Sequence, residues 1–448
     1  MKDLRNKWLI IALSCLAITV GSCSNSNDED ETTTAATITS CLKLTSDSSN
    51  DVYVAGHTYS DLDANTIIGN ADIFLIKYSS GGTRLWSRLS GSTENDYLQD
   101  LTIDLSGQTV MTGYTYGTLS SNSSAGGVDM LLIKTAADGS TIWKKQFGTD
   151  RDDYAYGITT DPSGNIYVAG HTYGSFEGTL SGTKDFVLLK LDSSGDQIWA
   201  RQLSNDEDNS YSASYGTYGI AVKTDNAGNV YGAGFTTGDL AGNSSSGLHD
   251  LFVVKYDSAG NLVWIKQLGS VGNDYVRGLQ VTGAGDIYLT GVTNGQLDGQ
   301  IHLGNDDIFL TKLNTDGNIE WIRQTGTEDN EYGNDIDLDS SGDVYLTGYT
   351  NSGFAGDSLG GSDLLIIKYD ATGDTKWMKQ LGTSSTEVAR AITIDASSDL
   401  YLTGYTFGEL DGKPTARVEA LLAACENAGF DATLNDNITS AIWHKFVF

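Results

Sequence analysis

Residues 156–203 read YGITTDPSGNIYVAGHTYGSFEGTLSGTKDFVLLKLDSSGDQIWARQL, and four short apolar runs in this stretch decide the fold. The runs are YGITTD, NIYVAGHT, DFVLLK and QIWARQL, and turn residues such as Gly, Ser, Asp and Asn separate them. Short runs rich in Val, Ile, Tyr and Trp between turn residues are typical of β-strands. DFVLLK is apolar at consecutive positions, as in a central strand that is buried on both faces. The stretch therefore predicts a four-stranded antiparallel sheet.

The same pattern repeats along the chain. A Gly-x-Thr motif recurs at intervals of 56 to 64 residues, with its glycine at Gly56, Gly113, Gly170, Gly234, Gly291, Gly348 and Gly404. Tryptophans of the fourth run keep step with it, at Trp86, Trp143, Trp199, Trp264, Trp321 and Trp377. A sheet of about 57 residues cannot bury both faces alone, but seven sheets arranged radially around an axis can. We therefore predict an all-β protein, a β-propeller of four-stranded blades.

The motifs GNIYVAGHTYG (164–174) and DDYAYGI (152–158) resemble the SBBP family of seven-bladed β-propeller repeats. The resemblance covers roughly residues 40–412, and we assign 37–412 to the propeller. It implies an exported repeat protein, and this family has no assigned chemistry. The seventh unit supplies ITIDASSDLYLTGYTFGELDG but then lacks its Asp-apolar-Lys and Trp runs. We therefore expect six complete blades and a partial seventh.

The first 36 residues predict export. Residues 1–23 combine basic residues, an apolar run from Trp8 to Val20 and the small residues Gly21 and Ser22 before Cys23. Such a run is too short to span a bilayer comfortably and is typical of a cleavable signal. The end of the segment resembles the lipobox of bacterial lipoproteins, which implies acylation of Cys23; the alternative is an ordinary secretory signal that contains a Cys. Residues 24–36 form an acidic flexible tether, so we expect a lipoprotein anchored at the outer membrane or cell surface.

The charge balance restricts the partners. The chain has 27 Lys and Arg against 58 Asp and Glu, and its formal net charge is -31. This charge repels phosphate backbones and anionic headgroups, so we expect no nucleic-acid binding and membrane contact only through the lipid anchor. The leading hypothesis is a non-catalytic binding or scaffold module for an extracellular carbohydrate or protein.

Residues 413–448 do not follow the repeat. Val418, Leu421, Leu422 and Cys425 have helical spacing, which predicts a short α-helical tail. The segment resembles a fragment of ketopantoate reductase, in which Lys445 stands at the catalytic lysine and NADPH is the cofactor. The dinucleotide fingerprint of that family is missing, so reductase activity is the alternative hypothesis and is not expected. A truncated or chimeric reading frame explains such a tail.

One interblade linker is about eight residues longer than the others, at residues 204–218. It offers carboxylates and aromatic rings for a sugar or peptide, and we select it as the candidate ligand loop; simple tolerance of an insertion is the alternative. Its candidate residues are Asp206, Glu207, Asp208, Tyr211, Tyr215 and Tyr218.

Other polar residues have structural interpretations. An aspartate stands five residues before a lysine in six units, for example Asp250 and Lys255. The aspartates could collect a cation such as Ca²⁺, but we favour a cap at the start of the strand, and for the lysines an interblade hydrogen bond. His57 and His171 occupy equivalent positions and are expected to pack. The sequence has no nucleophile motif, so we predict no catalytic residue, no cofactor and no metal site; a propeller hydrolase is a further alternative.

Overall fold

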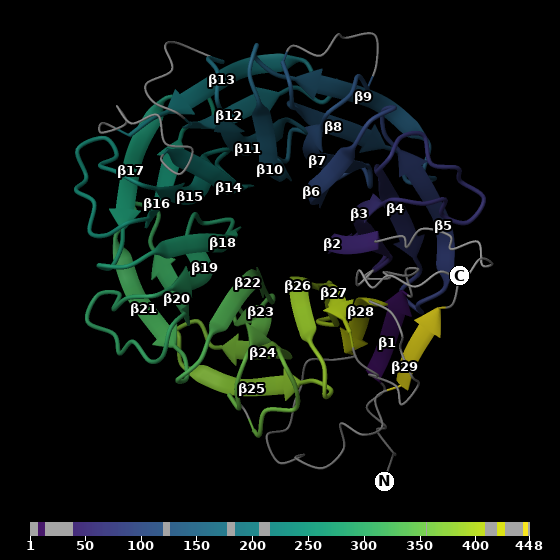
Figure 1. The fold of residues 1–448 in the computed structure, drawn as a ribbon. Helices are drawn as coiled ribbons and strands as arrows, with labels where there is room; N and C mark the ends of the chain where they lie inside the picture. The colour runs from purple at the N-terminus through teal and green to yellow at the C-terminus, as the bar shows by residue number, and fades with distance from the viewer. Residues whose placement is uncertain are drawn as a thin grey trace, which may run out of the picture.

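The computed structural model describes residues 8–13, 39–119, 126–176, 184–205, 216–354, 356–407, 419–425 and 442–446. In 8–13, 39–41, 419–425 and 442–446 it describes only the backbone. Seven sheets surround one axis, with the first strand of each repeat nearest the centre (Figure 1). The described residues contain strands and no helix. The prediction of an all-β propeller with six four-stranded blades is confirmed.

Six of the sheets are antiparallel, with four strands each in chain order from the axis outward. The first three consist of β2 (Thr39–Ser46), β3 (Val52–Thr58), β4 (Asp72–Tyr78) and β5 (Arg84–Ser90); β6 (Asp96–Ile103), β7 (Thr109–Thr115), β8 (Asp129–Thr135) and β9 (Thr141–Phe147); and β10 (Asp153–Thr160), β11 (Ile166–Thr172), β12 (Asp185–Leu191) and β13 (Gln197–Leu203). The next three consist of β14 (Thr217–Thr224), β15 (Val230–Thr236), β16 (Asp250–Tyr256) and β17 (Leu262–Leu268); β18 (Asp274–Val281), β19 (Ile287–Thr293), β20 (Asp307–Leu313) and β21 (Ile319–Thr325); and β22 (Glu331–Leu338), β23 (Val344–Thr350), β24 (Asp363–Tyr369) and β25 (Thr375–Leu381).

The hydrophobic core lies between the blades. Alternate residues of a strand point to opposite faces of the sheet, so each blade packs against both neighbours. One cluster joins Val110 of the second blade to Ile158 of the third. Another joins Leu44 of the first blade to Tyr401 of the seventh, so the ring closes between the first and last repeats.

The seventh sheet has five strands in the order β26-β27-β28-β1-β29, and only two of them belong to the repeat. These strands are β26 (Glu387–Ile394), β27 (Leu400–Thr406), β28 (Glu419–Cys425), β1 (Trp8–Leu13) and β29 (Ile442–Phe446). The structure thus extends the two repeat strands with three strands from outside the repeat. The two-stranded partial blade is therefore not confirmed.

The helical tail predicted for 413–448 is wrong where the structure describes it. β28 pairs antiparallel with β27 over seven residues, from Leu400 opposite Cys425 to Thr406 opposite Glu419. The outer edge of β27 carries backbone groups that need hydrogen-bond partners, and an added strand supplies them. An apolar run such as EALLAAC fits either a helix or a buried strand, so its period alone does not decide between them.

The repeated aspartates at the start of each third strand are buried and hold the loop before them. The Asp250 carboxylate accepts a hydrogen bond from the Ser246 backbone N–H at 2.7 Å and one from Gln267 Nε2 at 3.0 Å. Asp307 and Asp363 make the same two kinds of contact. The predicted capping role is therefore confirmed for these residues.

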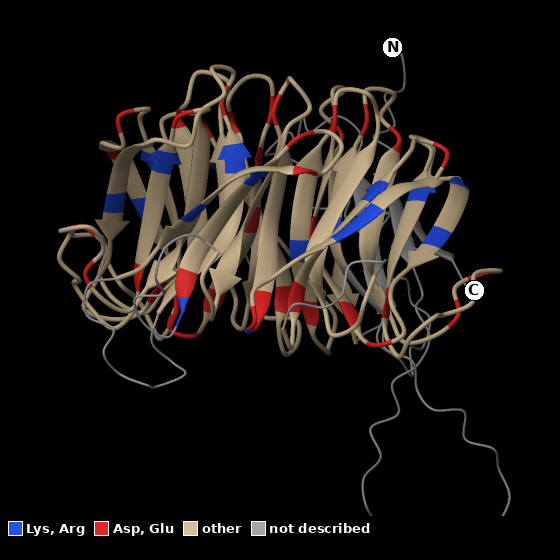
Figure 2. Cartoon of the chain, turned by 90° about the horizontal axis from the view of Figure 1, so that it is seen from above, with Lys and Arg blue, Asp and Glu red and all other residues tan. Residues whose placement is uncertain are grey.

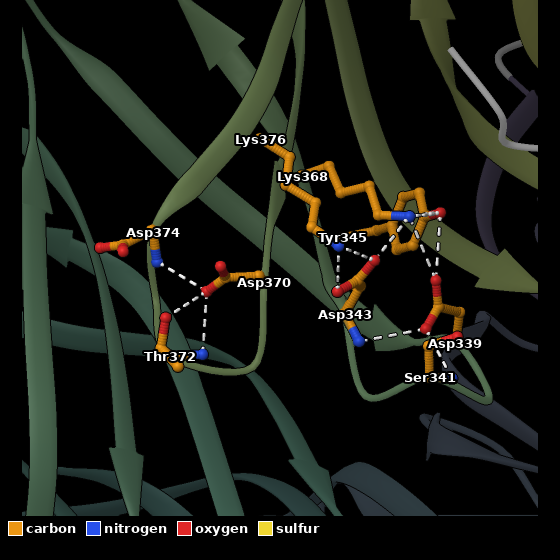
Figure 3. A network of polar contacts seen from close by, with 9 residues as sticks. All are labelled: Asp339, Ser341, Asp343, Tyr345, Lys368, Asp370, Thr372, Asp374 and Lys376. Carbon is orange, nitrogen blue, oxygen red and sulfur yellow. Dashed lines mark hydrogen bonds and ion pairs between the residues drawn. The ribbon is translucent and has the colours of Figure 1, made fainter. Parts of the chain in front are cut away.

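The repeated lysines bind turns of their own blade, of the next blade, or of both. In the sixth blade, Lys368 Nζ lies 3.2 Å from an oxygen of Asp339 and 2.9 Å from one of Asp343, at the turn between β22 and β23 (Figure 3). In the third blade, Lys190 Nζ donates to the Ser258 carbonyl of the fourth blade at 2.9 Å. The predicted interblade hydrogen bond is confirmed in this pair.

The Asp-x-x-Gly sequences form plain hairpin turns. Asp370 Oδ1 accepts hydrogen bonds from the backbone N–H of Thr372 and Asp374 at 2.9 and 3.0 Å (Figure 3). Gly373 follows with a φ of 83°, which favours glycine. The turn carboxylate thus binds its own backbone. Because such turns recur at the ends of the strands, Asp and Glu gather at both rims of the disc (Figure 2).

Candidate functional site

Each of the seven inner strands contains a β-bulge that directs one extra residue toward the axis. In β10, Ala155 pairs with Gly170 and Gly157 pairs with Ala169, so Tyr156 is left without a partner. A bulge re-aims a side chain in this way. We call the seven bulged residues the bulge ring. They are Leu42, Gln99, Tyr156, Ile220, Arg277, Asn334 and Arg390.

The bulge ring surrounds a chamber of about 420 Å³ on the propeller axis, which we call the axial chamber. Lys43, Phe235, Tyr275 and Val276 complete its wall. The bulge ring combines apolar, amide, phenol and guanidinium side chains. A concave surface with aromatic walls and a few convergent polar groups has the character of a small-ligand site.

Aromatic side chains form a collar where the inner strands β6, β10, β14, β18 and β22 begin, and two of them, Phe235 and Tyr275, line the chamber. Cross-strand pairs stack there: Tyr218 and Phe235 have ring centroids 4.5 Å apart, and those of Tyr332 and Tyr349 are 4.7 Å apart. The pairs also touch between blades, since Phe235 lies 4.9 Å from Tyr275. The aromatic collar consists of Tyr97, Tyr114, Tyr154, His171, Tyr218, Phe235, Tyr275, Tyr332 and Tyr349.

The two equivalent histidines are packing residues, as predicted. His171 is only 5% exposed and stacks on Tyr154 and Tyr156 at 5.1 and 5.3 Å. Burial, and then the nearby charge of Lys184, lowers the pKa of His171 to about 3. Burial lowers the pKa of His57 to about 4. Both rings are therefore neutral near pH 7.

Replacing His171 with Phe, the residue at the equivalent position 235, is expected to reduce the acid sensitivity of folding. Below pH 6.5 this histidine becomes protonated in the unfolded chain but stays neutral in the folded protein. The free energy of unfolding therefore decreases as the pH falls. Between pH 7 and pH 4.5 the wild type should lose about 2 to 3 kcal/mol more unfolding free energy than His171→Phe. Urea unfolding at both pH values measures this difference, and equal losses would contradict the pKa of His171.

A polar cavity of about 230 Å³ adjoins the chamber, since Lys43, Tyr156 and Arg277 are among the residues that line both. Lys43 Nζ lies 4.0 Å from an oxygen of Asp100 and 3.8 Å from one of Asp335, so it links three inner strands. Asp335 also accepts a hydrogen bond from the Ile392 backbone N–H at 3.2 Å, and burial raises the pKa of this carboxyl group. These contacts brace the inner strands beside the chamber.

Among the site residues predicted from the sequence, only Tyr218 has a described side chain. Asp206, Glu207, Asp208, Tyr211 and Tyr215 lie outside the described residues, as does Cys23, and only the backbone of Lys445 is described.

Tyr218 joins the aromatic collar, where its hydroxyl oxygen accepts a hydrogen bond from Lys184 Nζ at 2.5 Å.

Within the described ranges, no three His, Cys, Asp or Glu residues are grouped as metal ligands. In the same part of the chain, no helix is long and apolar enough to cross a membrane.

Reasoning from the sequence missed the bulge ring. A bulge is invisible in a strand pattern, because the run stays apolar and keeps its length. In five of the seven units an acidic residue, such as Glu331, begins the inner strand, and the bulged residue stands three positions after it. This spacing locates the position, but the residues beside it also vary between units, so the sequence does not single it out.

Comparisons with known proteins point to the same architecture. The SBBP family, described as a beta-propeller repeat, matches residues 142–177, 320–355 and 376–410. The chain is 24% identical over 468 residues to the uncharacterized WD repeat-containing protein L264 of Acanthamoeba polyphaga mimivirus, which covers 81% of the chain and 30% of that protein. It is 26% identical over 169 residues to the regulatory protein FlaEY of Caulobacter vibrioides, which covers 33% of the chain and 18% of that protein. The chain spans less than a third of the length of either relative.

Solved structures also resemble it. The WD40 domain of Neurospora crassa Pan2 gives a TM-score of 0.49 at 10% identity, over 86% of this chain and 89% of that one. The polysaccharide lyase Uly1 gives a TM-score of 0.48 at 10% identity, over 94% of this chain and 98% of that one. Seven sheets around one axis and three matched repeats together identify the chain as a β-propeller repeat protein.

Proposed function

We propose that the protein is an exported, lipid-anchored binding module whose axial chamber takes an extracellular carbohydrate. The observation that carries the proposal is the bulge ring, which places seven side chains of mixed chemistry, among them two arginines, around one chamber. Aromatic rings beside polar groups suit a sugar, because its C–H faces pack on the rings and its hydroxyls bond to the polar groups.

Two features favour binding over catalysis. The described residues around the chamber include no serine, cysteine or histidine beside an acidic partner in the arrangement of a nucleophile and its base. The reductase hypothesis depends on a sequence resemblance of residues 413–448, and this chain has no dinucleotide-binding fingerprint to hold NADPH. We therefore propose no enzymatic activity.

Filling the chamber tests the proposal. Replacing Gln99 with Trp should abolish binding on a glycan array, because the larger ring occupies the space that the ligand needs. Leu105 is 87% exposed on the turn after β6, so Leu105→Trp is a matched control that should bind as the wild type does. Equal glycan binding by Gln99→Trp and the wild type would place the ligand elsewhere on the protein, and binding of protein ligands alone would favour the other extracellular partner class.

The proposed anchor has a structural consequence. Processing before Cys23 removes β1, since β1 ends at Leu13, and β28 then becomes an outer strand of the seventh sheet. Mass spectrometry of the mature N-terminus tests the anchor directly: an acylated Cys23 is expected, and an unmodified terminus contradicts it.

A further inference from the structure

Two arginines of the bulge ring face the axial chamber without a carboxylate partner. Arg277 of β18 and Arg390 of β26 both line the chamber, and within the described part of the chain neither lies within 4.0 Å of a carboxylate oxygen. This is unexpected in a chain with 58 acidic and 27 basic residues, where lysines such as Lys77 and Lys134 are paired. The two positive charges are therefore available to a ligand.

The guanidinium group of Arg277 is held in place but not fully satisfied. Its Nη1 donates to Asn334 Oδ1 at 3.4 Å, and the group lies over the Tyr332 ring at 5.5 Å. Its Nε is buried and has no hydrogen-bond partner. A buried donor without a partner lowers stability, and native structures rarely keep one without a reason. A carboxylate binds an arginine through two parallel hydrogen bonds, so it would satisfy Nε together with a terminal nitrogen.

The second arginine, Arg390, lies in the inner strand of the seventh blade, so Asn334 of the sixth blade stands between the two arginines in the order of the blades. Arg390 is exposed and lies over the Tyr405 ring at 5.5 Å. Asn334 Nδ2 donates to the Ala389 carbonyl at 2.7 Å, which ties the inner strands of the sixth and seventh blades together. Burial lowers the pKa of Arg277, and the charge of Arg390 acts in the same direction. An anion between the two groups relieves that repulsion.

The other residues that line the chamber indicate the chemistry of the uncharged part of the ligand. Tyr156, Ile220, Phe235 and Tyr275 form an apolar and aromatic wall contributed by the third to fifth blades. A volume of about 420 Å³ lies at the lower end of the range for small-ligand pockets. The net charge of -31 opposes a polyanion but leaves room for one carboxylate in a local positive site.

We propose that the axial chamber binds a sugar that carries a single carboxylate, the terminal uronic acid of a glycan, with its carboxylate between Arg277 and Arg390. The proposal rests on the carbohydrate-binding function and specifies its ligand class. The sugar ring lies against the aromatic wall, and the uronate carboxylate completes the hydrogen bonding of Arg277.

The test compares pairs of oligosaccharides that differ only in a terminal glucuronate or glucose, titrated calorimetrically into the full chain. The glucuronate probes should bind at least about tenfold more tightly than their neutral partners, since charge-assisted hydrogen bonds are the strong ones. Arg277→Gln and Arg390→Gln should each reduce this preference, and the double variant should remove it. Gln99 occupies the same bulge position in β6, so glutamine fits the local backbone, and circular dichroism melts check that it does.

Arg151 is exposed on the loop before β10, and Arg151→Gln should keep the preference, which separates a local site from a general effect of charge. Equal affinity for glucuronate and glucose probes overturns this inference and leaves the carbohydrate-binding proposal standing. A preference for glucuronate that survives in the double variant also overturns it. Failure of every glycan probe to bind overturns both proposals.

Discussion

Replacing Gly170 with Ala is expected to destabilise the protein by about 3 to 5 kcal/mol, enough to leave much of it unfolded. A Cβ atom at Gly170 would lie 1.9 Å from the Tyr154 carbonyl oxygen and 3.0 Å from Ala155 Cα. Both obstacles are backbone atoms of β10, so no side-chain rotation relieves the overlap. Either β10 and β11 separate or the bulge at Tyr156 disappears.

Chemical denaturation measures the effect, and Gly356→Ala is the matched control. A Cβ atom at Gly356 would have no heavy atom within 4 Å, so that variant should stay within about 0.5 kcal/mol of the wild type. If Gly170→Ala unfolds at the wild-type denaturant concentration, the close approach of the two strands is not required. A folded Gly170→Ala protein that loses glycan binding would show instead that the bulge had been given up.

The repeat made the propeller predictable from the sequence. It did not show why each repeat has a glycine at the start of its Gly-x-Thr motif. The glycine of Gly-x-Thr served as a marker of the period. In the structure, each such glycine stands opposite the residue that precedes the bulge, as Gly170 does opposite Ala155 and Gly348 opposite Gly333. Strand periodicity does not show a bulge, because it concerns the pairing of two segments rather than either segment alone.

The candidate site was predictable only in part for a related reason. Sequence reasoning searched the longest linker, and Tyr218 at its end does belong to the aromatic collar. Arg277 and Arg390 stand more than a hundred positions apart in the chain, inside strands that read as ordinary repeats. Only closure around the axis brings them to one chamber.

The seventh sheet shows where local pattern fails. Residues 419–425 have an apolar spacing that fits a helix, and the edge of β27 decides otherwise, since its backbone groups need partners. Local propensity is a weak guide when an unpaired strand edge lies within reach. Whether residues 419–425 form a helix or a strand depends on their contacts with β27, which is not visible in the local sequence.

Replacing Leu422 with Pro is therefore expected to destabilise the full chain by about 3 kcal/mol or more. In the unprocessed chain Leu422 pairs with Thr403 of β27 and with Ile11 of β1, so it lies inside the sheet. Proline has no backbone N–H to donate to either neighbour, and it is tolerated mainly at sheet edges. Thermal melting of the full chain measures the loss.

Leu422→Ala separates the backbone from the side chain, because alanine keeps the N–H group that proline removes. The alanine variant should lose less stability than the proline variant, and a chain that ends at Gly412 should melt no higher than the proline variant. Equal midpoints for the proline variant and the wild type would mean that β26 and β27 close the ring without β28. That outcome would restore the two-stranded seventh blade, because the ring would then depend only on the core that joins Leu44 to Tyr401.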